Sequence, residues 1–117
     1  MSDETSESKS GGRLERVLAA GHFAMTAETS PAASADLTPQ LGRLKPLVGL
    51  ADAVNVTDGA TAKAHVTSLV VALRMVELGL DPVLQFTVRD RNRIALQGDL
   101  LGAGAAGIPN ILCLTGD

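Results

Sequence analysis

The stretch PVLQFTVRDRNRIALQGDLLGAGAAGIPNILCLT, residues 82–115, predicts a strand, a helix and a second strand in succession. The outer runs, PVLQFT from Pro82 and NILCLT from Asn110, are short and apolar, without a regular alternation of polar residues. Strands that are apolar on both faces are typical of a parallel sheet covered by helices. The segment between them, NRIALQGDLLGAGAAG, is apolar enough for a helix, although each of its four glycines costs about 1 kcal/mol of helix propensity relative to alanine. The stretch therefore predicts one βαβ unit.

The same unit recurs along the chain. Two further apolar runs, FAMTAE from Phe23 and DAVNVT from Asp52, precede this stretch, and the four runs start about 28 to 30 residues apart. Residues 61–80 have the best helical pattern, with apolar side chains at three-and-four spacing. Those side chains are Val66, Leu69, Val70, Leu73, Val76 and Leu80. Another helix is expected after Asp36, and Pro46 must kink or end it.

Four βα units in succession predict an α/β fold, either a (β/α)8 barrel or an open doubly wound sheet. Polar residues follow every predicted strand, and in a barrel these strand ends converge on one face. They are Glu28 and Thr29, Thr57 and Asp58, Thr87 with Arg89 and Asp90, and Thr115 with Asp117. Glu28, a carboxylate in the apolar setting MTAETSP, is a candidate general acid at that face. If these side chains are only solvated caps, the chain is instead a non-catalytic α/β module.

The length of 117 residues suits one modest domain. Residues 1–12, MSDETSESKSGG, are polar and charged with nothing to bury, and we expect them to form a disordered leader. The folded domain is therefore expected to occupy residues 13–117.

Composition argues against several classes of partner. No apolar run approaches the roughly 18 residues of a membrane span and no signal pattern opens the chain, so we expect a cytoplasmic protein. A net charge of −3, scattered basic residues and the absence of Trp and Tyr argue against nucleic acid. Cys113 is the single cysteine, and its apolar surroundings predict a reduced thiol in the core. Only His22 and His65 accompany it, so no metal cluster is expected.

Three local patterns suggest functions that their context does not support. GAGAAG, residues 102–107, matches the dinucleotide fingerprint G-x-G-x-x-G, but it closes a helix and precedes a strand, whereas the fingerprint follows a strand. We interpret its small residues as positions of close helix packing. NVT at residues 55–57 is a glycosylation sequon inside a predicted strand, and we expect no glycan there. His65 is expected early in the helix at 61–80, as a packed or solvated histidine.

Four segments together resemble, in order and spacing, the first four βα units of the methylenetetrahydrofolate reductase family. These segments are TAETSP, DAVNVTDG, LQFTVRDRNRIALQGDLLGAGAAGI and NILCLTGD. The resemblance covers residues 23–117, and its most specific part is RDRNRIALQGDLLGA at residues 89–103. It implies a (β/α)8 barrel that carries FAD, with NADH or NADPH reducing the flavin and methylenetetrahydrofolate then accepting a hydride to become methyltetrahydrofolate.

The resemblance also implies roles for individual residues. Glu28 matches the general acid that protonates a folate nitrogen, and Asp117 matches the acid of the family's GD pair, which lies beside the flavin and the pterin. Thr57 matches a threonine that contacts the flavin, and the segment Leu114, Thr115 and Gly116 matches the flavin-lining part of the fourth strand.

Two positions depart from the family pattern. Gln85 stands where some members have a histidine near FAD, and Thr115 stands where some have an arginine, so the flavin contacts are expected to differ here. Glutamine can still donate a hydrogen bond, although it does not titrate.

The resemblance implies that residues 13–117 are the N-terminal part of a barrel that typically needs about 250 residues. We expect the 117-residue chain by itself to bind FAD weakly and to be inactive, and the full-length form allows a homo-oligomer. An alternative is a flavin-free pterin-binding barrel, such as a methyltransferase domain, that positions a pterin with Asp117.

Overall fold

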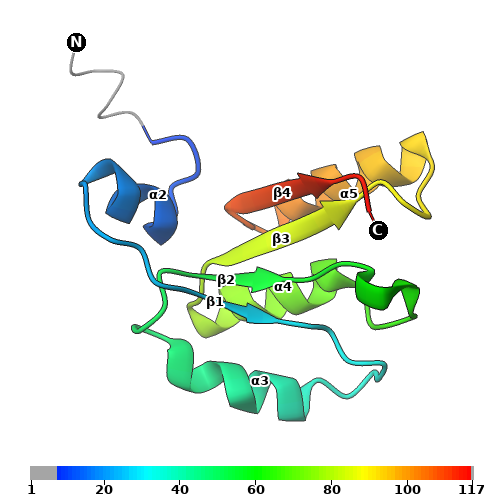
Figure 1. The fold of residues 1–117 in the computed structure, drawn as a ribbon, viewed down its shortest axis with the longest axis horizontal. Coiled ribbons are helices and arrows are strands. Elements are labelled where there is room, and N and C mark those ends of the chain that lie inside the picture. Colours follow the sequence, from blue (N-terminus) through cyan, green and yellow to red (C-terminus); the bar gives the residue numbers. More distant parts are fainter. Residues whose placement is uncertain (1–7, 117) are drawn as a thin grey trace.

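Four parallel strands pair in the order β1-β2-β3-β4 in the computed structural model, which describes residues 8–116 (Figure 1). The strands are β1 (Thr26–Thr29), β2 (Ala53–Val56), β3 (Pro82–Thr87) and β4 (Asn110–Leu114). The α-helices are α2 (Arg13–Ala19), α3 (Thr38–Leu44), α4 (Ser68–Leu78) and α5 (Arg93–Ala105). Two short 3-10 helices, η1 (Lys45–Leu47) and η2 (Ala60–Ala62), follow α3 and β2. The predicted α/β fold is therefore confirmed as four parallel strands alternating with helices, with α3, α4 and α5 connecting successive strands, whereas the described residues do not close a barrel.

The strands lie close to their predicted positions. β3 and β4 begin at the predicted residues, Pro82 and Asn110. β1 begins at Thr26 instead of Phe23, whose side chain is exposed, and β2 begins one residue after Asp52. The backbone N–H of Asp52 donates to the carbonyl of Met25, and the Asp52 carboxylate accepts from the backbone N–H of Met25, so a side-chain bond adds to the backbone pairing just before β1 and β2.

The predictions for α3 and α5 are confirmed. α3 ends at Leu44, and Pro46 lies in η1, because a proline cannot continue the α-helical hydrogen bonds. α5 forms despite its glycines, and it begins with a cap in which Asn92 Oδ1 accepts from the N–H of Ala95 at 2.8 Å. The GAGAAG segment closes α5 and precedes β4, as expected.

The prediction of one helix over residues 61–80 is wrong at its start, because α4 begins only at Ser68. Thr61 and Ala62 have φ values of 59° and 56°, which an α-helix does not allow. His65 therefore lies in the loop before α4 and not early in the helix. The apolar spacing continues through this loop, so periodicity alone extended the helix too far.

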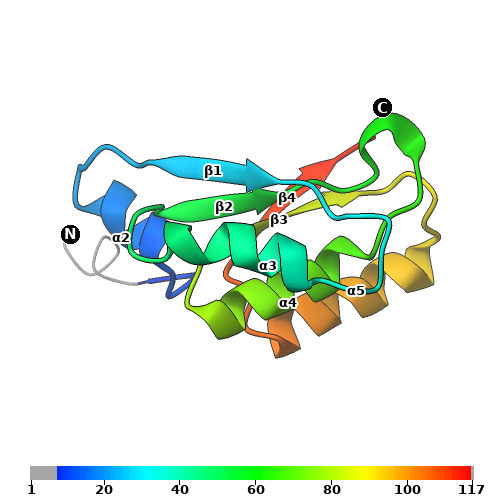
Figure 2. The same ribbon diagram turned by 90° about the horizontal axis from the view of Figure 1, so that it is seen from below.

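All three crossover helices, α3, α4 and α5, cover the same face of the sheet (Figure 2). The core between these layers contains Val54, Val56 and Leu84 from the strands and Val71 and Met75 from α4. The opposite face of the described sheet is open. Its side chains include polar ones at alternate positions, so the expectation that the strands are apolar on both faces is wrong for β1, β2 and β3.

Cys113 is exposed, which corrects the expectation of a core thiol. It pairs in register with Phe86 of β3, but β4 is an edge strand of the described sheet. α4 packs against β2 and β3, and α5 packs against α4, so little covers the outer edge of β4. Ile111, on the same side of β4 as Cys113, is exposed for the same reason, at 36%. Leu112 is level with Gln85 on the open face, where it is 44% exposed.

Helix α2, which the sequence did not reveal to us, lies beside the amino ends of the strands (Figure 1). The backbone N–H of Arg13 donates to the Asp81 carboxylate, and Arg13 Nε lies 2.8 Å from Asp52 Oδ1. Glu15 accepts hydrogen bonds from the backbone N–H groups of Lys9 and Ser10, which lower its pKa to about 2. Residues 8–12 of the predicted leader thus fold onto α2, and residues 1–7 lie outside the described range.

No helix in residues 8–116 is long and apolar enough to cross a membrane.

Candidate functional site

A cavity of about 290 Å³ lies on the open face of the sheet, toward the carboxyl ends of the strands. All four strands or their following loops contribute to it. Its lining consists of Glu28, Thr57, Asp58, Gly59, Ala60, Gln85, Thr87, Arg89, Leu114, Thr115 and Gly116. The cavity lies where parallel sheets usually hold their ligands, since loops after the strands converge there.

Six of the predicted site residues line this one cavity. They are Glu28, Thr57, Gln85, Leu114, Thr115 and Gly116. Asp117, the seventh, lies outside the described residues. The alternation of side chains along each strand explains the grouping, because partners in a parallel ladder point to the same face. Thr87 is level with Leu114, and Glu28 is level with Asn55, in the register of the sheet.

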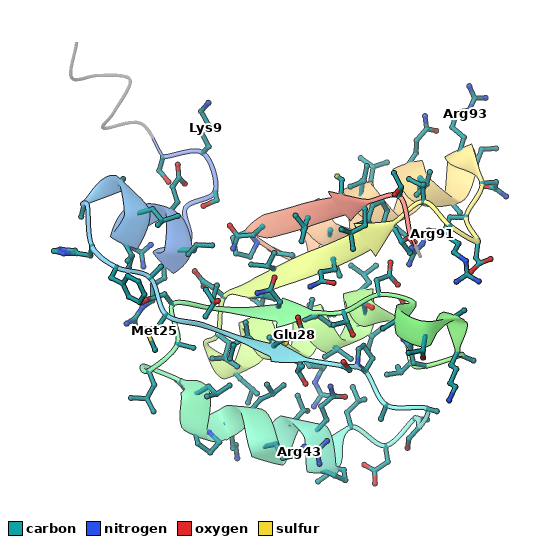
Figure 3. All side chains as sticks on the ribbon, viewed as in Figure 1. Lys9, Met25, Glu28, Arg43, Arg91 and Arg93 are labelled. Carbon is teal, nitrogen blue, oxygen red and sulfur yellow. The ribbon has the colours of Figure 1, made fainter. Side chains whose placement is uncertain are left out.

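Glu28 lies on β1, in the middle of the view in Figure 3, and is exposed on the open face. Asn55 is beside it on β2, where its amide donates to the carbonyl of Ala27 at 3.4 Å. The Glu28 carboxyl group is therefore accessible at the wall of the cavity, where it can exchange a proton with a bound molecule.

Thr57 is held at the end of β2 by three contacts. Its backbone N–H donates to the carbonyl of Thr29, and its hydroxyl donates to Ser30 Oγ at 3.0 Å. Its own carbonyl accepts from the hydroxyl of Ser68, the first residue of α4, at 2.6 Å. Thr57 is only 8% exposed, so its position in the cavity wall is fixed by β1 and α4 together.

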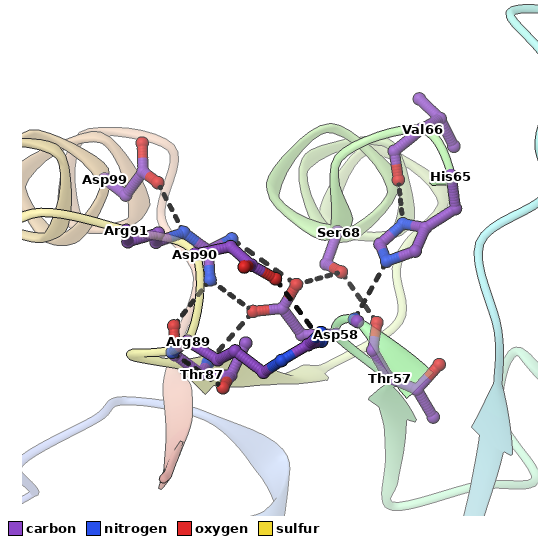
Figure 4. A network of polar contacts seen from close by, with 11 residues as sticks. Thr57, Asp58, His65, Val66, Ser68, Thr87, Arg89, Asp90, Arg91 and Asp99 are labelled. Carbon is purple, nitrogen blue, oxygen red and sulfur yellow. Dashed lines mark hydrogen bonds and ion pairs between the residues drawn. The ribbon is translucent and has the colours of Figure 1, made fainter. Parts of the chain in front are cut away.

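Asp58, the next residue, is the centre of a polar network between strand ends (Figure 4). Asp58 Oδ2 accepts from the backbone N–H of Thr87 at 2.9 Å and from Arg91 Nη1 at 2.6 Å. Arg91 also donates to the carbonyl of Thr87 at 2.7 Å and, through Nε, to Asp99 at 3.2 Å. The hydrogen bond to Asp58 is the main cause that raises the pKa of the Arg91 guanidinium.

The loop after β2 is held by His65. Its Nε2 accepts from the backbone N–H of Gly59 at 2.9 Å, and its Nδ1 lies 2.6 Å from the carbonyl of Val66. An imidazole that accepts at Nε2 must carry its proton at Nδ1, which then donates to Val66. His65 is thus a packed histidine that positions Gly59 and Ala60 in the cavity lining.

Gly116 brings the backbone after β4 close to β3. Its φ is 98°, in the region that favours glycine. A Cβ at this position would lie 2.8 Å from Arg89 Cβ and 2.8 Å from Thr87 Oγ1. Only glycine fits this crossing without displacing its neighbours.

Sequence reasoning missed Ser68, Arg91 and Asp99 as parts of this region. Asp58 was noted only as a polar residue after a strand, and its partner Arg91 is 33 residues away. The cluster RDRNR, residues 89–93, was the available signal, since several arginines directly after a predicted strand need partners. Among residues 8–116, no group of three or more metal-ligating side chains is present.

A comparison with known families adds an independent finding. The family model described as methylenetetrahydrofolate reductase matches residues 13–117. The chain belongs to the methylenetetrahydrofolate reductase family. This confirms the resemblance found in the sequence and supports a folate-related reduction in broad terms. No match was found among curated proteins. In this methylenetetrahydrofolate reductase family member, the cavity described above is lined by six of the seven site residues expected from the sequence, and Asp117 lies outside the described residues.

Proposed function

We propose that the protein catalyses the flavin-dependent reduction of 5,10-methylenetetrahydrofolate to 5-methyltetrahydrofolate, with NADH or NADPH as electron donor. The observation that carries this proposal is the convergence of the six family-pattern residues on one cavity. Family membership alone supports a reductase of this kind, and the shared cavity supports the assignment of its site.

The cavity lining suits a flat, polar-edged ring system such as the flavin of FAD. Gln85 and Thr57 offer an amide and a hydroxyl for hydrogen bonds, and Leu114 offers an apolar contact. The absence of a Cβ at Gly116 lets the backbone of this wall lie close to Thr87 and Arg89. FAD, when bound, supplies hydride transfer between the nicotinamide and the folate.

In this proposal, the Glu28 carboxyl group donates its proton to the nitrogen of the folate methylene bridge. The carbon–nitrogen bond then breaks, and the bridge becomes an iminium whose carbon can accept a hydride. Asp117 is assigned from the family pattern, and its negative charge would stabilise the developing cation. Gln85 holds its ligand by hydrogen bonding only, so its contact should not depend on pH.

The proposed fold is a (β/α)8 barrel in which the four described strands are the first four. The open face of the sheet would then be the inner face of the barrel, where polar strand-end residues meet. Residues 13–117 form the N-terminal part of this domain in the proposal. Soluble nicotinamide and folate substrates fit the cytoplasmic location expected from the sequence.

The test uses the protein expressed from its complete gene and purified without added flavin. The proposal predicts the visible absorption spectrum of bound FAD. Under anaerobic conditions NADH or NADPH should bleach this spectrum, and methylenetetrahydrofolate should restore it. A colourless protein that binds methyltetrahydrofolate would contradict the proposal and favour the flavin-free methyltransferase alternative.

A further inference from the structure

A largely buried ion pair between Asp58 and Arg91 connects the ends of the strands that line the cavity. The side chain of Asp58 is 6% exposed and that of Arg91 is 18% exposed, and their closest atoms are 2.6 Å apart. Asp58 lies directly after Thr57 at the end of β2, and Arg91 follows β3, which carries Gln85 and Thr87. The pair therefore spans the two strands that form the middle of the cavity.

Each partner also holds other elements. Asp58 accepts from the backbone N–H of Thr87 and lies 3.5 Å from the hydroxyl of Ser68 at the start of α4. The Arg91 guanidinium donates to the carbonyl of Thr87 and to Asp99 of α5, and it lies 4.9 Å from the ring centre of Phe86. Thr87, a cavity residue, is thus bound on both its N–H and its carbonyl by this pair (Figure 4).

We propose that Arg91 is a positioning residue that acts through Asp58 to fix the ends of β2 and β3 around the bound ligand. The positive charge of Arg91 is already paired with Asp58 and Asp99. We therefore assign Arg91 to positioning the cavity wall and not to binding an anionic group of the ligand. The predicted effect on FAD rests on the proposed function, whereas the effect on Thr87 does not. Small displacements of groups that line a site can cost about 10- to 100-fold in function.

The chain offers a matched control at the opposite end of the sheet. Arg13 pairs with Asp52 at 2.8 Å, and the Asp52 side chain is 10% exposed. Removing either arginine leaves a largely buried carboxylate without its positively charged partner, so both changes should lower the free energy of unfolding. Only Arg91 contacts the strand ends that line the cavity.

The experiment compares Arg91→Gln, Arg91→Lys and Arg13→Gln in the protein expressed from its complete gene. The dissociation constant for FAD is measured by fluorescence at a temperature well below the melting point of every variant. Amide hydrogen exchange of Thr87 is measured without ligand. We expect Arg91→Gln to weaken FAD binding by about 10-fold or more and to speed Thr87 exchange, while Arg13→Gln changes neither.

Arg91→Lys should give an intermediate result, because one ammonium group cannot reproduce the contacts to Asp58, Asp99 and the Thr87 carbonyl together. Because lysine keeps the positive charge, Arg91→Lys can replace Arg91→Gln in both measurements if Arg91→Gln does not fold. The positioning role would be overturned if Thr87 exchanged at the same rate in Arg91→Gln and Arg13→Gln. It would also be overturned if both variants lost FAD affinity to the same extent. If the unchanged protein binds no FAD, the proposed function fails, and the Thr87 exchange still decides the role of Arg91.

Discussion

Individual residues in the cavity are constrained by space as well as by chemistry, and Gly116 is the clearest case. A Cβ there would meet Arg89 Cβ and Thr87 Oγ1 at 2.8 Å, on a backbone with φ of 98°. The first contact is near the main chain, so a side-chain rotation cannot relieve it. Glycine at this position is therefore a geometric requirement of the cavity wall.

Gly116→Ala should lower the free energy of unfolding by about 1–3 kcal/mol and weaken FAD binding, because β4 and β3 must move apart at the cavity. Urea unfolding and flavin titration check the two effects. Gly98→Ala is the matched control: Gly98 lies within α5 with no atom near its missing Cβ. That change should stabilise the protein by about 0.5–1 kcal/mol, and a similar gain for Gly116→Ala would show that the crossing is not tight.

Among the elements, α2 is attached to the sheet by charge more than by apolar burial. None of its residues is buried, whereas Arg13 bonds to Asp52 and Asp81 at the amino ends of the strands. The hydrogen bond from the Met25 N–H, followed by that from Arg13, lowers the pKa of Asp52 below its usual 3.8. The ionised form of Asp52 is thus favoured by folding.

A lowered pKa in the folded state gives stability that is present above pH 3.8, the unfolded value, and is lost as the pH falls through the folded value. Asp52→Asn should therefore flatten the fall of the melting temperature in acid. Melting curves from neutral pH down to about pH 3 test this, with Glu77→Gln as a control in the exposed pair with Arg74. An Asp52→Asn curve parallel to that of the unchanged protein would show that the contacts of Asp52 with Met25 and Arg13 do not contribute to the loss of stability in acid.

Elements with local signals were predicted from the sequence. The apolar runs at Pro82 and Asn110 gave the starts of β3 and β4, and Pro46 gave the end of α3. The start of α4 was not predictable from spacing, because the loop before it makes a long-range contact in which the backbone N–H of Val66 donates to the carbonyl of Ala32. α2 had a periodic Leu14, Val17 and Leu18 pattern that we did not recognise.

In the site, too, the features with a local sequence signal were predicted, and those set by contacts distant in sequence were not. Residues at strand ends came together because parallel strands share a carboxyl edge, which a repeat of βα units implies. The Asp58–Arg91 pair joins positions 33 residues apart, and although the RDRNR cluster indicates that its arginines need partners, it does not identify Asp58 as one of them. The exposure of Cys113 depends on how far α5 extends over β4, which composition does not reveal.

At the scale of the whole described fold, the open face of the sheet determines how the chain should behave by itself. Helices cover one face only, and Leu112 is 44% exposed on the edge strand β4. Unpaired backbone groups at strand edges and exposed apolar side chains both favour association with other chains. In the proposed barrel, further strands would cover this face.

A chain of residues 1–117 alone should therefore self-associate and lose FAD during gel filtration. The elution volume and the flavin absorbance of the peak measure both properties. A monodisperse, yellow and active species would contradict the proposal that further barrel strands complete this face.

In the proposed enzyme the cavity serves two half-reactions, of which only the folate step uses Glu28. The most direct test of this division is stopped-flow measurement of both half-reactions in Glu28→Gln, in the protein expressed from its complete gene. Flavin reduction by NADH or NADPH should stay near the unchanged rate, while flavin oxidation by methylenetetrahydrofolate should slow by about 10²-fold or more, the usual scale for loss of a general acid. Equal slowing of both steps, or of neither, would contradict the account.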